Sequence, residues 1–358
     1  MKNYQLSSIK EIISEAKKGK MFILVDDKNR ENEGDLIIPG SKCNSKNINF
    51  MAMHGRGLIC LALTKKQVDK LSLPLMSSVN KARMQTAFTV SIEAKKGITT
   101  GISAYDRAKT IKVAINSKTK KKDIVSPGHV FPLVSRNGGV LERAGHTEAS
   151  IDISKLAKLN PSAVICEVMN EDGRMARLDD LLKFSKKHNL KIGSIEDLIS
   201  YRLKNEKLVI NTTNKNLKIK NFGNFYVKIY KNKLDNSEHY AFIKGKLKLN
   251  KPVRVRVIST TIIRNKINFN NDLLKKSLSY LSKFNNFVLI LIKNQNLSDL
   301  KSNLEKIKNN NTLRYYGIGA QIIKDLRVKN MILITRSKKK IIGLDGYNIK
   351  IKKQEIIK

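Results

Sequence analysis

Cysteine is rare in this sequence, with three residues among 358. Cys43, Cys60 and Cys166 lie far apart, no two of them are spaced as CxxC, and their number is odd. These features argue against a disulfide framework of the kind that holds small secreted domains together. A reducing compartment is the simplest setting for such a chain, and we expect a cytoplasmic location.

Long apolar runs and tryptophan are both absent. No apolar run reaches the roughly 18 residues that a membrane-spanning helix needs, so we expect no membrane partner. The N-terminal segment MKNYQLSSIKEII is too polar for a secretory signal peptide. Without tryptophan, and with only 6% aromatic residues, the chain has little surface on which nucleic-acid bases could stack.

Acidic residues are scarce as well, because 30 of them face 70 lysines and arginines, which gives a formal net charge of +40. A basic chain can bind nucleic acid or another anionic surface. The excess is mostly lysine, however, and lysine, asparagine and isoleucine share A/T-rich codons. We therefore favour genome composition as its origin and expect no specific nucleic-acid partner. A nucleic-acid-binding protein with an enzyme ancestor is the alternative.

The length of 358 residues predicts two domains, and the composition changes near residues 203–212. We place the domains at 1–205 and 206–358. In the first domain, Ser8 and Glu11 predict a capping box at the start of a helix. Strands are predicted at 21–27, 57–64, 87–94 and 162–169.

The residues between 71 and 86 show no periodicity and predict a long loop, which in a compact domain is often functional. Helices and strands are otherwise interspersed. This mixture favours the α+β fold class, as a layered sandwich, over a doubly wound sheet.

The segment DDKNRENEGDLIIPG, Asp26 to Gly40, concentrates carboxylates at the end of an apolar run. Its acidic residues are Asp26, Asp27, Glu31, Glu33 and Asp35, with Arg30 in the middle. Carboxylates at the end of a strand suit acid–base chemistry and Mg²⁺, which prefers oxygen ligands and usually keeps several waters. Taken alone, the segment could equally be a polar turn.

Three further motifs favour a catalytic interpretation. His129 in SPGHVFPL and His146 in LERAGHTEAS each lie beside a glycine. Arg143 and Thr147 flank His146 at a predicted helix start, where their side chains and the free backbone N–H groups could hold a phosphate. Glu167 lies in an apolar strand, where burial would raise its pKa and suit it to acid–base catalysis. Together with the acidic segment, these motifs favour Mg²⁺-assisted chemistry on a small phosphorylated polyol or ketose.

These motifs, with HGRGLICLALT and FTVSIEAKKGITTGISAYDRAKT, closely resemble 3,4-dihydroxy-2-butanone 4-phosphate synthase of riboflavin biosynthesis over about residues 5–203. The resemblance implies a layered α/β/α sandwich and a homodimer whose active site borrows residues across the interface. It implies a lyase that converts D-ribulose 5-phosphate to formate and L-3,4-dihydroxy-2-butanone 4-phosphate. It also implies Mg²⁺ or Mn²⁺ as the cofactor, with two ions in each active site.

The resemblance also gives roles to individual residues. Glu31 and His146 would hold the divalent metal, and His129, Glu167 and Glu33 match catalytic positions. Substrate contacts would come from Arg30, Glu31, Asp35, Thr100, Asp106, Arg143, Ala144, Gly145, His146, Thr147 and Glu167. From their position and composition, we further predict that loops at 28–40 and 74–86 close over the site.

The second half resembles GTP cyclohydrolase II in NTLRYYGIGAQIIKDLRVKNMILIT and in KIIGLDGYNIKI. That enzyme needs three zinc-binding cysteines, but residues 204–358 contain no cysteine and a single histidine, His239. We therefore predict a smaller α/β domain with a degenerate cyclohydrolase fold that holds no zinc and opens no GTP ring. A bifunctional enzyme is the disfavoured alternative.

Overall fold

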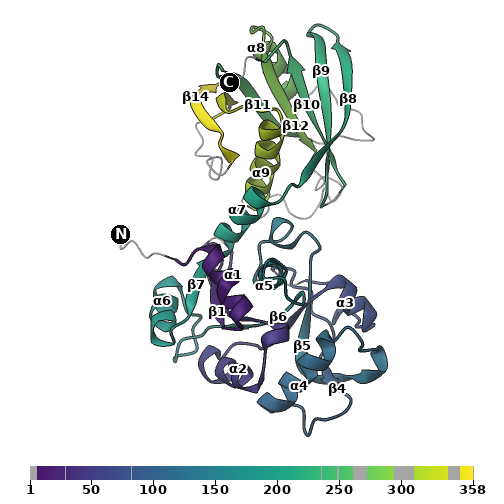
Figure 1. The fold of residues 1–358 in the computed structure, drawn as a ribbon, viewed down its shortest axis with the longest axis vertical. Helices are drawn as coiled ribbons and strands as arrows, with labels where there is room; N and C mark the ends of the chain where they lie inside the picture. Colours follow the sequence, from purple (N-terminus) through teal and green to yellow (C-terminus); the bar gives the residue numbers. More distant parts are fainter. Residues whose placement is uncertain are drawn as a thin grey trace. The chain divides into compact units, whose positions relative to one another are not determined.

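The computed structural model describes residues 6–28, 30–81, 83–234, 236–247, 250–260, 272–293, 310–337 and 347–357. The chain divides into two compact units, Met1–Tyr201 and Arg202–Lys358 (Figure 1). The division falls four residues before the predicted boundary at 205/206. No helix among the described residues is long and apolar enough to cross a membrane.

A seven-stranded mixed sheet forms the centre of the first unit, in the order β4-β5-β3-β6-β2-β1-β7. Its strands are β1 (Phe22–Val25), β2 (Gly34–Pro39), β3 (Cys60–Thr64), β4 (Ile92–Ala94), β5 (Ile124–Ser135), β6 (Ser162–Glu167) and β7 (Lys191–Ser194). Only the β1–β7 and β3–β5 pairs are parallel. The sheet is therefore not doubly wound, which agrees with the prediction from the sequence.

Helices cover both faces of this sheet and make three layers. They are α1 (Ile9–Lys18), α2 (Ser45–Phe50), α3 (Lys65–Lys70), α4 (Ala104–Ile115), α5 (His146–Leu156) and α6 (Leu178–Lys187). On one face, Ile23, Leu36 and Val164 share a core with Ile48 of α2 and Ile111 of α4. On the other face, α5 packs against β2, β3, β5 and β6, and α1 packs against α5. The predicted α/β/α sandwich is confirmed.

Helix α1 follows from local sequence signals. Ser8 and Glu11 form the predicted capping box, and Gly19 ends the helix in the left-handed region at φ 72°. Its buried residues are Ile9, Ile12, Ile13 and Ala16. Burying each isoleucine contributes about 1.5–3 kcal/mol. Local capping and tertiary burial therefore favour the same helix.

The strand predicted at 87–94 is shorter in the structure, where β4 begins at Ile92. Residues 87–89 still run beside β5: Val134 N–H donates to the Ala87 carbonyl, and Phe88 makes an isolated bridge to Leu133. Pro132 of β5 has no N–H to donate, so a continuous ladder cannot form here. The β-prone sequence therefore runs alongside β5 without completing the strand.

The second unit is also built on a seven-stranded mixed sheet, in the order β14-β13-β11-β12-β10-β9-β8. Its elements are β8 (Val209–Ile219), β9 (Gly223–Asn232), β10 (Glu238–Lys244), β11 (Val253–Thr260), α8 (Asp272–Leu281), β12 (Phe287–Lys293), α9 (Asn310–Asp325), β13 (Asn330–Thr335) and β14 (Lys350–Ile356). The unit division falls within α7 (Ile195–Asn205). Phe242, Phe287 and Leu278 anchor a second core. The predicted α/β domain is confirmed.

Candidate functional site

The acidic loop between β1 and β2 is organised by Asp26. The Asp26 carboxylate accepts the backbone N–H groups of Glu31 at 3.2 Å and Glu33 at 2.9 Å. It also accepts Nη1 of Arg30 at 2.7 Å. The sequence analysis placed Asp26 in the acidic cluster without giving it a role. Asp26 directly follows β1 and binds backbone N–H groups five and seven residues later, so its carboxylate fixes the conformation of this loop.

His146 opens helix α5 and lies buried beside the acidic loop. Its Nε2 donates to the Leu24 carbonyl of β1 at 3.1 Å, so the Nε2 proton is fixed and Nδ1 is free to accept. Nδ1 lies 3.5 Å from Oδ1 of Asp35 and 3.9 Å from Oε2 of Glu31. Burial lowers the pKa of His146 to about 4, so the ring is neutral at pH 7. A neutral imidazole with a free Nδ1 can bind a metal.

Asp26, Glu31 and His146 each offer one ligand atom, and these three atoms lie within 4.8 Å of one another. Both oxygens of Asp26 accept hydrogen bonds, and Oε2 of Glu31 accepts Nη1 of Arg30, so a cation held by Glu31 and His146 would share or replace that arginine contact. Oδ1 of Asp35 is buried and has no hydrogen-bond partner, beside His146 Nδ1. A buried carboxylate oxygen without a donor is costly unless a cation or solvent meets it. The residues present therefore fit a divalent cation.

Burial raises the pKa of three carboxyl groups near His146, those of Asp35, Glu167 and Glu33. Asp35 of β2 pairs in register with Glu167 of β6. Burial raises the pKa of Asp35 well above its usual value, and the charges of Glu167 and Glu31 add to the effect. Burial likewise raises the pKa of Glu167 and of Glu33. The shift at Glu167 is in the predicted direction, and carboxyl groups of raised pKa suit proton transfer.

The segment from Arg143 to Thr147 leads into the N-terminus of α5, as predicted. Gly145 caps the helix, and Ala144, His146 and Thr147 are buried. A Cβ added at Gly145 would lie 2.3 Å from Nη1 of Arg143 and 3.1 Å from Nη2 of Arg30. Two guanidinium groups thus flank the start of the helix. Guanidinium groups and helix N-terminal N–H groups are what phosphate oxygens bind.

Arg143 has a second set of partners in the structure. Nη1 donates to Oε2 of Glu148 at 2.6 Å, and Nη2 donates to Oγ1 of Thr86 at 2.9 Å and to the Met84 carbonyl at 3.0 Å. Arg143 therefore holds the end of the loop that precedes β4. A phosphate contact through Arg143, as the sequence predicts, would require some of these hydrogen bonds to be exchanged.

His129 lies on β5 in a separate group of side chains. Its Nδ1 is hydrogen-bonded to Oε1 of Glu93 in β4, which the sequence analysis did not single out. Glu93 is the only acidic residue in the apolar run FTVSIEA, and this was the one feature of the sequence that could have indicated its role. Gly101, at φ 87°, backs this pair: a Cβ there would lie 1.7 Å from Glu93 Oε1 and 2.8 Å from His129 Nδ1. The carboxylate can orient the imidazole only because residue 101 is glycine.

Two other predicted residues lie near this pair. Asp106 is buried and accepts Oγ1 of Thr99 at 2.7 Å and the Gly101 N–H at 3.1 Å, and these hydrogen bonds lower its pKa. Asp106 thus shapes the turn that carries the exposed Thr100. In the sheet order, β3 separates β5 from β6, so His129 and Glu167 stand on strands about 10 Å apart.

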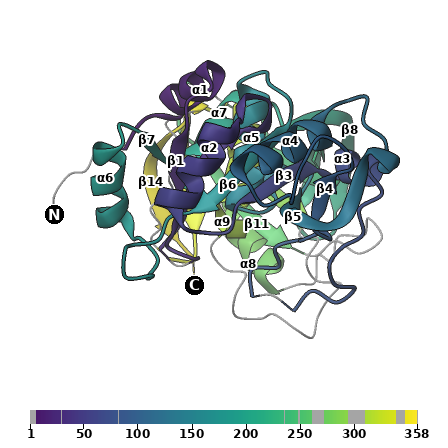
Figure 2. The same cartoon turned by 90° about the horizontal axis from the view of Figure 1, so that it is seen from below.

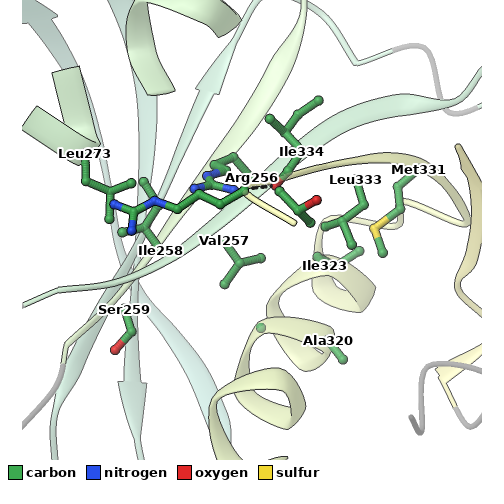
Figure 3. Close-up of a pocket in the computed structure, with 13 residues that line it drawn as sticks. Arg256, Val257, Ile258, Ser259, Leu273, Ala320, Ile323, Met331, Leu333 and Ile334 are labelled. Carbon is green, nitrogen blue, oxygen red and sulfur yellow. Dashed lines mark hydrogen bonds between the residues drawn. The ribbon is translucent and has the colours of Figure 1, made fainter. Parts of the chain in front are cut away.

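The second unit contains a cavity of about 190 Å³ (Figure 3). Its lining comes from the carboxyl ends of β11 and β13 and from α9, and includes Arg256, Ser259, Ala320, Ile323, Thr335 and Arg336. Nη1 of Arg256 donates to the Ile334 carbonyl at 2.8 Å. His239 is buried, hydrogen-bonded to Ser237 and to the Lys293 N–H. Its ring is thus already used within the fold.

Two family models match the chain. The model for 3,4-dihydroxy-2-butanone 4-phosphate synthase matches residues 10–201, and the model for GTP cyclohydrolase II matches residues 211–356. The Aquifex aeolicus riboflavin biosynthesis protein RibBA is 44% identical, over 99% of this chain and 93% of its own. The 3,4-dihydroxy-2-butanone 4-phosphate synthase of Photobacterium phosphoreum is 42% identical, over 97% of this chain and 98% of its own.

Solved structures give the same pattern. RibBX, a two-domain 3,4-dihydroxy-2-butanone 4-phosphate synthase from A. baumannii, has a TM-score of 0.85 and 39% identity over 98% of this chain and all of its own. A 3,4-dihydroxy-2-butanone 4-phosphate synthase in complex with two magnesium ions has a TM-score of 0.54 and 37% identity. That match covers 56% of this chain and 98% of the solved chain.

Proposed function

The chain belongs to the 3,4-dihydroxy-2-butanone 4-phosphate synthase family, and we propose that its first domain converts D-ribulose 5-phosphate to L-3,4-dihydroxy-2-butanone 4-phosphate and formate. One observation carries this proposal. The free Nδ1 of His146 faces Glu31 and Asp35, and two arginines flank the start of the same helix. A cation site thus adjoins an anion site, as a phosphorylated ketose requires.

Glu31 and His146 would hold Mg²⁺, with water and substrate as the remaining ligands. When bound, the ion would acidify the proton alpha to the substrate carbonyl and balance charge that develops on oxygen. A related synthase was solved with two magnesium ions, which supports two ions here as well. Mn²⁺ has similar ligand preferences and is the alternative.

Glu33 and Glu167 would move the protons. Burial raises the pKa of both carboxyl groups, which favours each of them as an acceptor of a proton from carbon. His129, oriented by Glu93, would be a further proton carrier. Water then leaves from C1 of the sugar and the carbon skeleton rearranges; a water molecule adds to C4, and C4 departs as formate. Arg30, Asp35, Thr147 and Arg143 would bind the substrate.

A homodimer would bring the two groups of catalytic residues together. Several apolar side chains near the sites are exposed in one chain: Leu58, Leu75, Met76, Val79, Ile102, Tyr105 and Val125. A contiguous patch of exposed apolar residues is typical of an interface. We place the partner subunit on this surface, so that His129 and Thr100 of one subunit complete the acidic site of the other.

For the second domain we propose no GTP ring-opening, because residues 204–358 offer no cysteine for zinc. The cavity between β11, β13 and α9 would bind a small ligand without catalysing a reaction on it. Metal analysis and a GTP turnover assay test this proposal together. Stoichiometric zinc with formate release from GTP would favour the bifunctional alternative.

Release of formate from ribulose 5-phosphate tests the main proposal. We expect formate only with Mg²⁺ or Mn²⁺, and we expect its loss in Glu31→Ala and His146→Ala. A folded wild-type dimer that releases no formate under these conditions would overturn the proposal. Nucleic-acid binding that persists at physiological salt would instead favour the alternative of a nucleic-acid-binding protein.

A further inference from the structure

The segment that follows β6 folds back onto the acidic loop. Val168 N–H donates to the Gly34 carbonyl at 3.0 Å, and Ala176 N–H donates to the Val168 carbonyl at 3.0 Å. The intervening hairpin returns the chain to the loop at Arg177, the N-cap residue of α6. Helix α6 lies beside β7 in both views (Figures 1 and 2). Arg177 therefore reaches the loop from an element far away in the sequence.

Arg177 binds the backbone of the loop. Its Nη1 donates to the carbonyl of Glu31 at 2.8 Å and to the carbonyl of Asn32 at 2.5 Å. Asn32 is in the left-handed region at φ 57°, so the chain turns sharply here. The same guanidinium lies 3.8 Å from Oε1 of Glu33. A single nitrogen of Arg177 thus restrains the carbonyl of Glu31 and the carbonyl of the next residue, Asn32.

Asp26 and Arg177 restrain the loop in opposite ways. Asp26 accepts N–H groups of Glu31 and Glu33, while Arg177 donates to carbonyls of Glu31 and Asn32. Asp26 directly follows β1 at the start of the loop, whereas Arg177 comes from the N-cap of α6. Leu181 of α6 packs against Gly34 and holds the helix there. Arg177 thus connects the acidic loop to helix α6.

We propose that Arg177 is a positioning residue of the metal site, which acts through the backbone of Glu31 and Asn32 to hold the Glu31 carboxylate opposite Nδ1 of His146. This inference rests on the proposed function, because it needs a cation at Glu31 and His146. Removing the outer partner of a metal ligand typically weakens metal binding about 10–100-fold. Since Asp26 still holds the loop, we expect the lower end of that range.

Calorimetry with Mg²⁺ alone tests this proposal on the full chain. Arg177→Met keeps an unbranched apolar stem but removes the guanidinium and its donors, and Arg177→Lys restores a donor and the charge. The matched control is Arg174→Met, because Arg174 lies on the same hairpin, is exposed and binds Asp172 in its own turn. We expect about tenfold weaker Mg²⁺ binding in Arg177→Met, partial recovery in Arg177→Lys, and wild-type binding in Arg174→Met.

Turnover then separates positioning from a general structural role. Saturating Mg²⁺ should restore most of kcat in Arg177→Met, with the melting temperature within about 2 °C of wild type. Mg²⁺ binding in Arg177→Met equal to that of Arg174→Met would overturn the inference. So would a weakening that accompanies a large fall in melting temperature. Wild-type protein that binds Mg²⁺ but releases no formate would overturn the proposed function and leave the role of Arg177 standing.

Discussion

At the scale of single residues, the active groups depend on partners that are distant in the sequence. Glu93 lies 36 residues before His129, and Arg177 lies 146 residues after Glu31. Glu31, His146 and Glu167 could be predicted because unusual local motifs mark them. Glu93 and Arg177 carry no such mark, since an acid in a strand or an arginine before a helix is common. Their roles exist only once the sheet is assembled.

Gly101 offers a sharp test at this scale. We expect Gly101→Ala to lower kcat at least tenfold, because the added Cβ would collide with Glu93 Oε1 and displace it from His129. Gly173→Ala is the control, since Gly173 has a similar φ of 82° but nothing within 4 Å of an added Cβ. Both variants should lose about 1 kcal/mol of stability from backbone strain. Equal activity in the two variants would remove Gly101 from this role.

His188 gives a pH-dependent prediction. Its ring packs against His54 at a centroid distance of 4.7 Å, and burial together with the His54 and Lys187 charges lowers its pKa. The unfolded chain therefore takes up this proton first, so stability is full above about pH 6.5 and falls as the pH drops below it.

Melting temperatures at pH 7.5 and pH 5.5 check the effect. The loss on acidification should be smaller in His188→Gln than in wild type. A loss of the same size in both proteins would mean that His188 does not contribute to it.

At the scale of elements, local signals predicted some segments fully and others in part. Helix α1 has its caps and its apolar positions in the sequence, and it forms as predicted. The prediction of a loop at 28–40 is wrong for the second half of that segment, because Gly34–Pro39 forms the fully buried strand β2. The charged composition of the segment suggested a loop, but pairing with β1 and β6 makes its second half a strand. Only the part before Gly34 could move over a substrate.

The loop before β4 should open when Arg143 can no longer hold it. In Arg143→Lys the contact with Glu148 can persist, but the paired donors to Thr86 and Met84 are lost. Hydrogen bonds from a charged donor contribute about 1.5–3 kcal/mol, so tryptic cleavage near the exposed Lys81 and Arg83 should rise about tenfold. Arg136→Lys is the control, because Arg136 is exposed. An unchanged cleavage rate would contradict this role of Arg143.

At the scale of the whole molecule, the proposed catalytic residues of one chain fall into two groups. His129 lies on β5, whereas Glu33 and Glu167 lie on the acidic loop and on β6, and β3 separates β5 from β6. The sequence can assign residues to a family site, but it cannot tell whether one subunit or two supply them. The number of exposed apolar side chains around both groups favours two subunits.

Mixing two inactive variants distinguishes these cases. His129→Gln and Glu31→Gln should each be inactive alone. If each site uses His129 from one subunit and Glu31 from the other, randomly mixed dimers should recover about a quarter of wild-type activity, because half are mixed and each of these has one intact site. No recovery after exchange of subunits would place both residues in the same chain's site.

The rung formed by Asp35 and Glu167 also affects stability. Burial and neighbouring charge raise the pKa of Asp35, so the metal-free protein should lose stability as the pH rises from about 4, the usual pKa of an aspartate, through the raised pKa. Asp35→Asn should abolish this loss and melt several degrees higher than metal-free wild type at pH 8, while losing activity. Melting curves in a chelator check this, and an unchanged pH dependence would contradict it.

The same cross-strand pair of Asp35 and Glu167 links the stability of the protein to metal binding. Ionising two facing carboxyl groups on adjacent strands costs stability, and a cation held by the neighbouring Glu31 and His146 would reduce that cost. At a Mg²⁺ concentration of 100 times the dissociation constant, binding adds about 2.7 kcal/mol to the folded state. Unloaded enzyme is then the species that unfolds most often, and a protease that degrades unfolded chains would remove it first. The pool of enzyme in a cell would thus adjust to the supply of its metal without any dedicated sensor.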